Sequence, residues 1–62
     1  MKTNIKLIVE LRKRGLRQRD FAKMIDERES KLSGVINGRL NLSDEEMDKW
    51  ASALGLTANK IF

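Results

Sequence analysis

The chain has 62 residues, of which 13 are lysine or arginine and 9 are acidic, so its net charge is +4, and it contains no cysteine and no histidine. We expect one domain over residues 1–62 with a small core, no disulfide or metal site built from thiolate or imidazole groups, and no enzymatic nucleophile–base pair. The longest apolar run spans only residues 7–9, far short of the ~20 residues of a membrane span, so no membrane partner is expected. We also expect no cofactor and no small-molecule substrate.

A first helix is predicted over residues 5–14. Thr3 or Asn4 can cap its start, because their short side chains accept hydrogen bonds from free backbone N–H groups. Gly15 can end it, since glycine adopts the left-handed conformation readily. The basic run at residues 12–14 suits the negative end of the helix dipole.

Two short helices are predicted over residues 17–25 and 29–37, and Gly38 ends the second of them. In each helix the apolar side chains recur at helical spacing and form one stripe. They are Phe21, Ala22 and Ile25 in one helix and Leu32, Val35 and Ile36 in the other. Because only a few polar residues separate the helices, they must cross steeply. This is the helix-turn-helix unit, whose second helix can enter a DNA major groove.

A fourth helix is predicted over residues 44–54. Ser43 and Glu46 have the spacing of a capping box, in which each side chain satisfies a backbone N–H of the other residue. Gly55 can end this helix, and Thr57 can cap a last short turn. No strand is expected.

The predicted core collects the apolar residues of all these elements. Its members are Ile8, Leu11, Leu16, Phe21, Ala22, Ile25, Leu32, Val35, Ile36, Leu42, Met47, Trp50, Ala51, Leu54, Leu56 and Ile61. Ala22 is small, as a steep helix crossing requires. Trp50 is assigned to the core because its neighbours are apolar, although tryptophan is also common at interfaces. Phe62 has two open roles, a plug of the core or an exposed anchor for a second subunit.

The helix-turn-helix unit resembles the phage-repressor and Cro-like (XRE-type) helix-turn-helix family. In that family, Gln is followed two residues later by an acid, then by an apolar residue and Ala, and a Ser-x-apolar-Ser-x-apolar run closes on Asn-Gly. These places are filled without a gap by Gln18, Asp20, Phe21, Ala22, Ile25, Ser30, Leu32, Ser33, Val35, Asn37 and Gly38. The similarity extends upstream to Leu11 and downstream through residues 47–56, so it covers nearly the whole chain.

The resemblance implies an all-α fold, namely a compact five-helix lambda-repressor-like domain, in a cytoplasmic phage or bacterial protein. It also implies a sequence-specific transcription regulator that binds double-stranded DNA and reads the major groove with the helix around residues 29–37. One recognition helix buries too little surface for tight specific binding. We therefore expect a homodimer on a palindromic operator.

Phosphate contacts are expected where basic and amide side chains lie near helix ends. Residues 1–40 carry a balance of +6 and residues 41–62 a balance of −2, which favours a phosphate-binding surface in the first part, although basic side chains also simply solvate helices. Gln18 can donate to a phosphate beside free backbone N–H groups, or have no partner. Asn37 can touch DNA or only cap its helix. The predicted phosphate-binding residues are Arg17, Gln18, Arg19, Lys31, Asn37 and Arg39.

Base reading is expected from the exposed N-terminal part of the third helix. The resemblance and the helix periodicity place five residues on the face opposite the apolar stripe. They are Arg28, Glu29, Ser30, Ser33 and Gly34. Arg can pair with guanine, Glu can accept from the cytosine amino group, and Ser can serve several bases. Glycine within a helix is unfavourable by roughly 1 kcal/mol relative to alanine, which suggests that Gly34 permits a close approach.

The chain departs from the family at the turn between the two helices. The usual Gly and apolar residue are replaced by Asp26 and Glu27, and the usual Ser or Thr cap is replaced by Arg28. Asp26 could cap a third helix that begins slightly earlier. With Glu29, these acids weaken general phosphate attraction. They motivate an alternative function, a protein-interaction module or antitoxin that uses the same fold to bind a protein.

Overall fold

Five helical elements make up the part of the chain that the computed structural model describes, residues 3–62. They are α1 (Ile5–Lys13), α2 (Gln18–Met24), α3 (Glu29–Ile36), α4 (Asp44–Ala53) and the short 3-10 helix η1 (Ala58–Lys60). No strand occurs in this part of the chain, so the predicted all-α, five-helix fold is confirmed. None of the helices within residues 3–62 is both long and apolar enough to cross a membrane.

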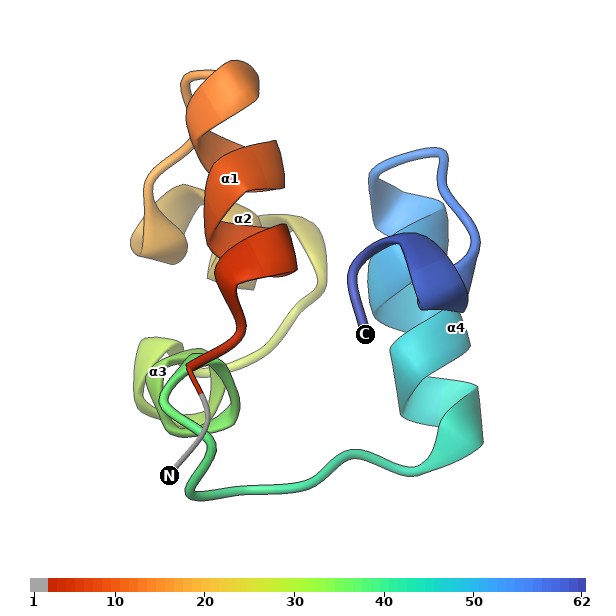
Figure 1. Cartoon of the computed structure of the whole chain (residues 1–62). Coiled ribbons are helices and arrows are strands. Elements are labelled where there is room, and N and C mark those ends of the chain that lie inside the picture. Colours follow the sequence, from red (N-terminus) through yellow and green to blue (C-terminus); the bar gives the residue numbers. More distant parts are fainter. Residues whose placement is uncertain (1–2) are drawn as a thin grey trace.

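The helices enclose the core from several directions. In Figure 1, α1 and α4 lie on opposite sides, α2 lies behind α1, and α3 is seen nearly end-on below α1. An extended linker leads from α3 to α4. After α4 the chain turns back through η1, and its last residues lie between α4 and α1 (Figure 1).

Asn4 joins three elements that are distant in sequence. Its side-chain oxygen accepts a hydrogen bond from Leu7 N–H at 3.0 Å, which makes Asn4, rather than Thr3, the N-cap of α1. Its backbone N–H donates to Ile36 O at 2.7 Å, and its side-chain Nδ2 donates to Ile61 O at 2.7 Å. The start of α1 is thereby fixed to the end of α3 and to the residue after η1.

All four α-helices end in the same backbone motif. The N–H of the second residue beyond each helix cap donates to the carbonyl five residues earlier, as in a Schellman motif. The donor and acceptor pairs are Leu16 and Leu11, Glu27 and Ala22, Arg39 and Gly34, and Leu56 and Ala51, at 2.8 to 2.9 Å. The motif needs a left-handed residue between cap and donor. Glycine fills that place at three of the ends, whereas Asp26, with φ of 56°, fills it after α2.

The turn at Asp26 fixes the start of α3. A non-glycine residue in the left-handed region is unfavourable by about 1 kcal/mol, although aspartate tolerates it better than most. Helix α3 begins at Glu29, and the preceding residue Arg28 makes no side-chain cap hydrogen bond. The prediction that Asp26 caps an earlier start of α3 is therefore wrong. The capping box of α4 is confirmed, since Ser43 and Glu46 each accept from the backbone N–H of the other.

Trp50 lies at the centre of the core and is fully buried, as predicted. Its ring packs edge-on against Phe21 with centroids 6.1 Å apart, and against the half-buried Phe62 at 6.3 Å. Phe62 therefore plugs the core. The predicted core omitted Leu7, which is fully buried, whereas the predicted member Ile8 is half-buried and packs against the core.

Candidate nucleic-acid interface

The unit formed by α2, its turn and α3 turns one face toward the core and the other toward solvent. Phe21, Ala22 and Ile25 are buried, as are Leu32, Val35 and Ile36. Both predicted stripes are therefore confirmed. Because the buried side chains of α3 lie on one side of a two-turn helix, its first residues present their side chains outward.

The predicted base-reading residues divide into an exposed and a buried group. Arg28, Glu29 and Ser30 are exposed at the start of α3. Ser33, one turn later, is half-buried, and its hydroxyl accepts a hydrogen bond from Asn37 Nδ2 at 3.3 Å. Ser33 can still donate its own hydroxyl proton to a base or phosphate.

Gly34 is buried, so its predicted exposure on the reading face is wrong. The side chain of Leu40 covers it, and a Cβ placed on Gly34 would lie 2.7 Å from Leu40 Cδ1 and 3.0 Å from Leu40 Cγ. The close approach that this glycine allows is made by the chain's own linker. The sequence did not reveal this, because the contact depends on how the linker folds back after α3.

The start of α2 and the end of α3 meet at a cleft. The cleft has a volume of about 360 Å³, and its wall includes Arg12, Arg17 and Gln18 together with Ile36. The predicted phosphate ligands Arg17 and Gln18 are thus near the end of α3, after which Asn37 and the exposed Arg39 follow. Arg12 was missing from the predicted phosphate-binding set, and the basic run at the end of α1 was its only signal in the sequence.

Helix α2 has an acidic residue near its positive end. The carboxylate of Asp20 accepts a hydrogen bond from Arg17 N–H at 3.1 Å. This bond satisfies the backbone donor that precedes the helix. The side chains of Arg17, Gln18 and Arg19 remain exposed around it.

Lys31 is held by two carboxylates. Its Nζ lies 3.2 Å from Glu27 Oε2 and 2.7 Å from Glu46 Oε2. Hydrogen bonds to Glu46 and then to Glu27 raise the pKa of Lys31 above its ordinary value. The hydrogen bond from Lys31, followed by that from the Ser43 backbone, lowers the pKa of Glu46. Lys31 thus connects the turn, α3 and α4, and its charge is largely balanced within the protein.

The remaining basic side chains are more available to a partner. Arg14 is paired with Glu10 at 3.0 Å on α1. Within residues 3–62, eight other exposed basic residues between the start of α1 and the linker after α3 make no ion pair. They are Lys6, Arg12, Lys13, Arg17, Arg19, Lys23, Arg28 and Arg39. A set of exposed cations around a helix-turn-helix unit fits a polyanion.

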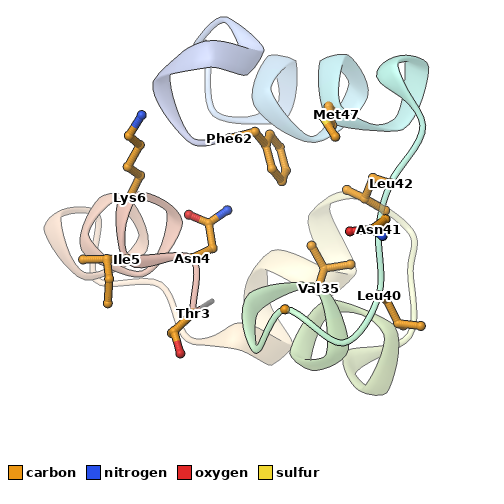
Figure 2. Close-up of a pocket in the computed structure, with 11 residues that line it drawn as sticks. Thr3, Asn4, Ile5, Lys6, Val35, Leu40, Asn41, Leu42, Met47 and Phe62 are labelled. Atoms are coloured by element: carbon orange, nitrogen blue, oxygen red, sulfur yellow. The ribbon is translucent and has the colours of Figure 1, made fainter. Parts of the chain in front are cut away.

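A second, larger groove lies between the start of α1, the linker after α3 and the C-terminal residues. Its volume is about 790 Å³, and its wall includes Val35, Leu40, Leu42, Met47 and Phe62. In Figure 2, Met47 and Phe62 lie across the depression from Val35, and Leu40 lies next to α3. The wall also includes the polar residues Thr3, Asn4, Lys6 and Asn41, so the groove combines apolar and polar side chains.

Comparison with known proteins gives one match. A family model described as helix-turn-helix matches residues 5–61, which include every helix of the structure. No curated protein and no solved structure matches the chain.

Proposed function

The chain belongs to the Cro/repressor-like, XRE-type helix-turn-helix family of DNA-binding regulators, and we propose that it is a sequence-specific transcription regulator that reads the major groove with α3. One observation carries the proposal. The exposed start of α3 offers polar and charged side chains, while the cleft beside its end offers Arg17 and Gln18. Base edges and phosphates require these two kinds of group at neighbouring positions.

We assign base reading to Arg28, Glu29, Ser30 and Ser33. Arg28 can donate two hydrogen bonds to guanine, Glu29 can accept from the cytosine amino group, and the serines can donate or accept. Gly34 leaves this set because Leu40 covers it.

We assign phosphate binding to residues near the start of α2 and after α3. These residues are Arg12, Arg17, Gln18, Arg19, Asn37 and Arg39. Lys31 takes a lesser part, because Glu27 and Glu46 already hold its ammonium group. The free N–H groups at the start of α2 favour a phosphate at the same place.

A two-fold symmetric operator bound by two copies of the chain completes the proposal. A helix as short as α3, with eight residues, contacts only a few base pairs, and specific complexes in general bury more surface than one such helix provides. Two copies spaced by one helical turn of DNA would supply the missing contacts. Such a regulator acts where the DNA is, in the cytoplasm of a bacterial cell.

The alternative, a protein-binding module, rested on three acids near the turn. Lys31 holds Glu27, so Asp26 and Glu29 are the two of these acids that make no ion pair within residues 3–62. The acidic edge is therefore weaker than the sequence indicates, and no contact in the described part of the chain favours a protein partner over DNA.

Selection of bound sequences from random duplex DNA tests the proposal. We expect a palindromic sequence to be recovered at 50 mM and at 200 mM salt, and Arg39→Ala to lower the yield. Lys49→Ala, which removes an exposed positive charge from α4, is the matched control and should leave the yield unchanged. Recovery of no preferred sequence, or equal losses in both variants, would contradict it.

A further inference from the structure

The backbone after α3 folds back onto one carbonyl group. Gly34 O accepts hydrogen bonds from Arg39 N–H at 2.8 Å and from Leu40 N–H at 3.1 Å. The backbones of Arg39 and Leu40 are therefore both held by the Gly34 carbonyl group. The chain passes close enough for the Leu40 side chain to lie over the Gly34 Cα.

The same contact explains why residue 34 is glycine. A Cβ at this place would lie 2.7 Å from Leu40 Cδ1, 3.0 Å from Cγ and 3.7 Å from Cβ. The first separation is too short for carbon atoms, the second is tighter than most such contacts, and the third is an ordinary contact. Gly34 lies within a helix, where alanine is intrinsically preferred. Helix α3 thus has glycine, the residue less favourable for a helix, at the place where the Leu40 side chain of the linker occupies the space of a Cβ.

Leu40 is 48% exposed although it is a large apolar residue. Removal of this side chain from water therefore contributes little to stability. The main effect of its contact with Gly34 is to restrain the linker. Arg39 lies in the linker between the end of α3 and Leu40, and its side chain is exposed.

We propose that Gly34 is a positioning residue for DNA binding, which acts by letting Leu40 and the linker close onto α3 so that Arg39 is held at a fixed place beside the helix. The inference rests on the proposed function, because it assigns Arg39 to a phosphate. A cation on a restrained backbone loses less conformational entropy on binding than one on a free loop. A methyl group at position 34 displaces the Leu40 side chain, so the contact that restrains the linker next to Arg39 is lost.

The affinity and salt dependence of five variants, compared with the unaltered protein on the selected operator, test the proposal. We expect Gly34→Ala to weaken binding about tenfold, equivalent to ~1.4 kcal/mol. It should also make the log–log salt slope shallower by the same amount as Arg39→Ala, because both remove the same phosphate contact. In Gly34→Ala/Arg39→Ala the loss should stay within about twofold of Arg39→Ala alone, since the two changes act through one group.

Leu40→Ala provides the matched reference, in which an alanine at position 34 has space. It removes Cδ1 and Cγ, the two atoms that a Cβ at position 34 would meet too closely, and keeps the Cβ at 3.7 Å. Gly34→Ala/Leu40→Ala should therefore fold and bind within about twofold of Leu40→Ala, even if Gly34→Ala alone fails to fold. A double variant that does not fold, or that binds tenfold more weakly than Leu40→Ala, would show that the alanine conflicts with something other than Leu40, and would overturn the proposal.

Two further outcomes separate this inference from the function on which it rests. If the unaltered protein binds the operator and Gly34→Ala binds with the same affinity and salt slope, the positioning role is wrong and the proposed function stands. If the unaltered protein binds no duplex in a salt-dependent way, the proposed function fails and the positioning role fails with it.

Discussion

Lys31 on α3 and Glu46 on α4 form an ion pair of 2.7 Å between elements that are 15 residues apart in sequence. Glu46 also accepts from the backbone N–H of Ser43 at 3.3 Å. One carboxylate therefore caps α4 and connects it to α3, and two testable consequences follow for pH.

The folded protein should lose stability in acid through Glu46. Its pKa is lowered in the folded state by Lys31 and Ser43, so its contribution is present above the ordinary value of 4.5 and is lost as pH falls through the lower folded value. Urea midpoints measured between pH 6 and pH 3 should fall more for the unaltered protein than for Glu46→Gln. Glu45→Gln, which changes an exposed neighbour, is the control and should follow the unaltered protein. Parallel curves for all three would show that the pair contributes nothing.

At alkaline pH the folded protein should lose stability as pH rises, and the group responsible is Lys31. Its raised pKa means that its contribution is present below the ordinary value of 10.5 and is lost as pH rises through the higher folded value. Because both partners remain exposed to solvent, the effect should be small and should shrink in high salt.

Asp26→Gly should stabilise the protein by about 0.5 kcal/mol. Glycine removes the strain of a left-handed aspartate, about 1 kcal/mol, but part of this gain is offset by greater freedom of the unfolded chain. Asp26→Asn removes the charge and keeps the tolerance for this conformation, so it should leave the free energy of unfolding nearly unchanged. Equal stabilisation by both variants would assign the effect to charge instead.

Ala22→Leu should destabilise the domain by about 1–3 kcal/mol, because Ala22 is 3% exposed in a packed core between α2 and α3. Thermal and urea unfolding measure the loss. Lys23→Leu adds the same side chain at the next, exposed position and should change stability by less than about 0.5 kcal/mol. An unchanged melting temperature for Ala22→Leu would mean that the helices do not cross at this residue.

Variants of the predicted interface should separate the residues that set sequence preference from those that only add affinity. Glu29→Gln and Ser30→Ala should change the preferred sequence by about 1–3 kcal/mol per affected base pair, and Gln at position 29 should shift the preference from cytosine toward adenine. Gln18→Ala and Arg39→Ala should instead weaken binding to all sequences about equally. If Glu29→Gln raises affinity uniformly and keeps the same preference, Glu29 merely repels the DNA backbone, and base reading falls to Arg28 and Ser33.

Local sequence patterns predicted most of this fold. The errors occur where contacts between residues distant in sequence determine which side chains are buried. Capping residues and helical spacing placed each α-helix boundary within one residue, because both signals are local. The core prediction omitted Leu7, and the hydrogen bonds that fix the start of α1 join Asn4 to Ile36 and Ile61, which are distant in sequence.

The candidate site shows the same division between local and distant information. Exposure of Arg28, Glu29 and Ser30 follows from the helix stripe alone and is as predicted. The cover over Gly34 comes from residue 40, and the second partner of Lys31 comes from residue 46. Neither partner lies on the same helix as its target, so helix periodicity contains no signal for them.

The salt dependence of binding tests the central claim most directly. If each of two subunits neutralises about three phosphates, the log–log slope of affinity against salt for the palindromic operator should be roughly −5 between 50 and 200 mM. Binding to a duplex of unrelated sequence should be weaker but should also depend strongly on salt. A slope near zero would contradict the account, because the exposed cations around the helix-turn-helix unit would then displace no counterions, and DNA would not be the partner of this surface.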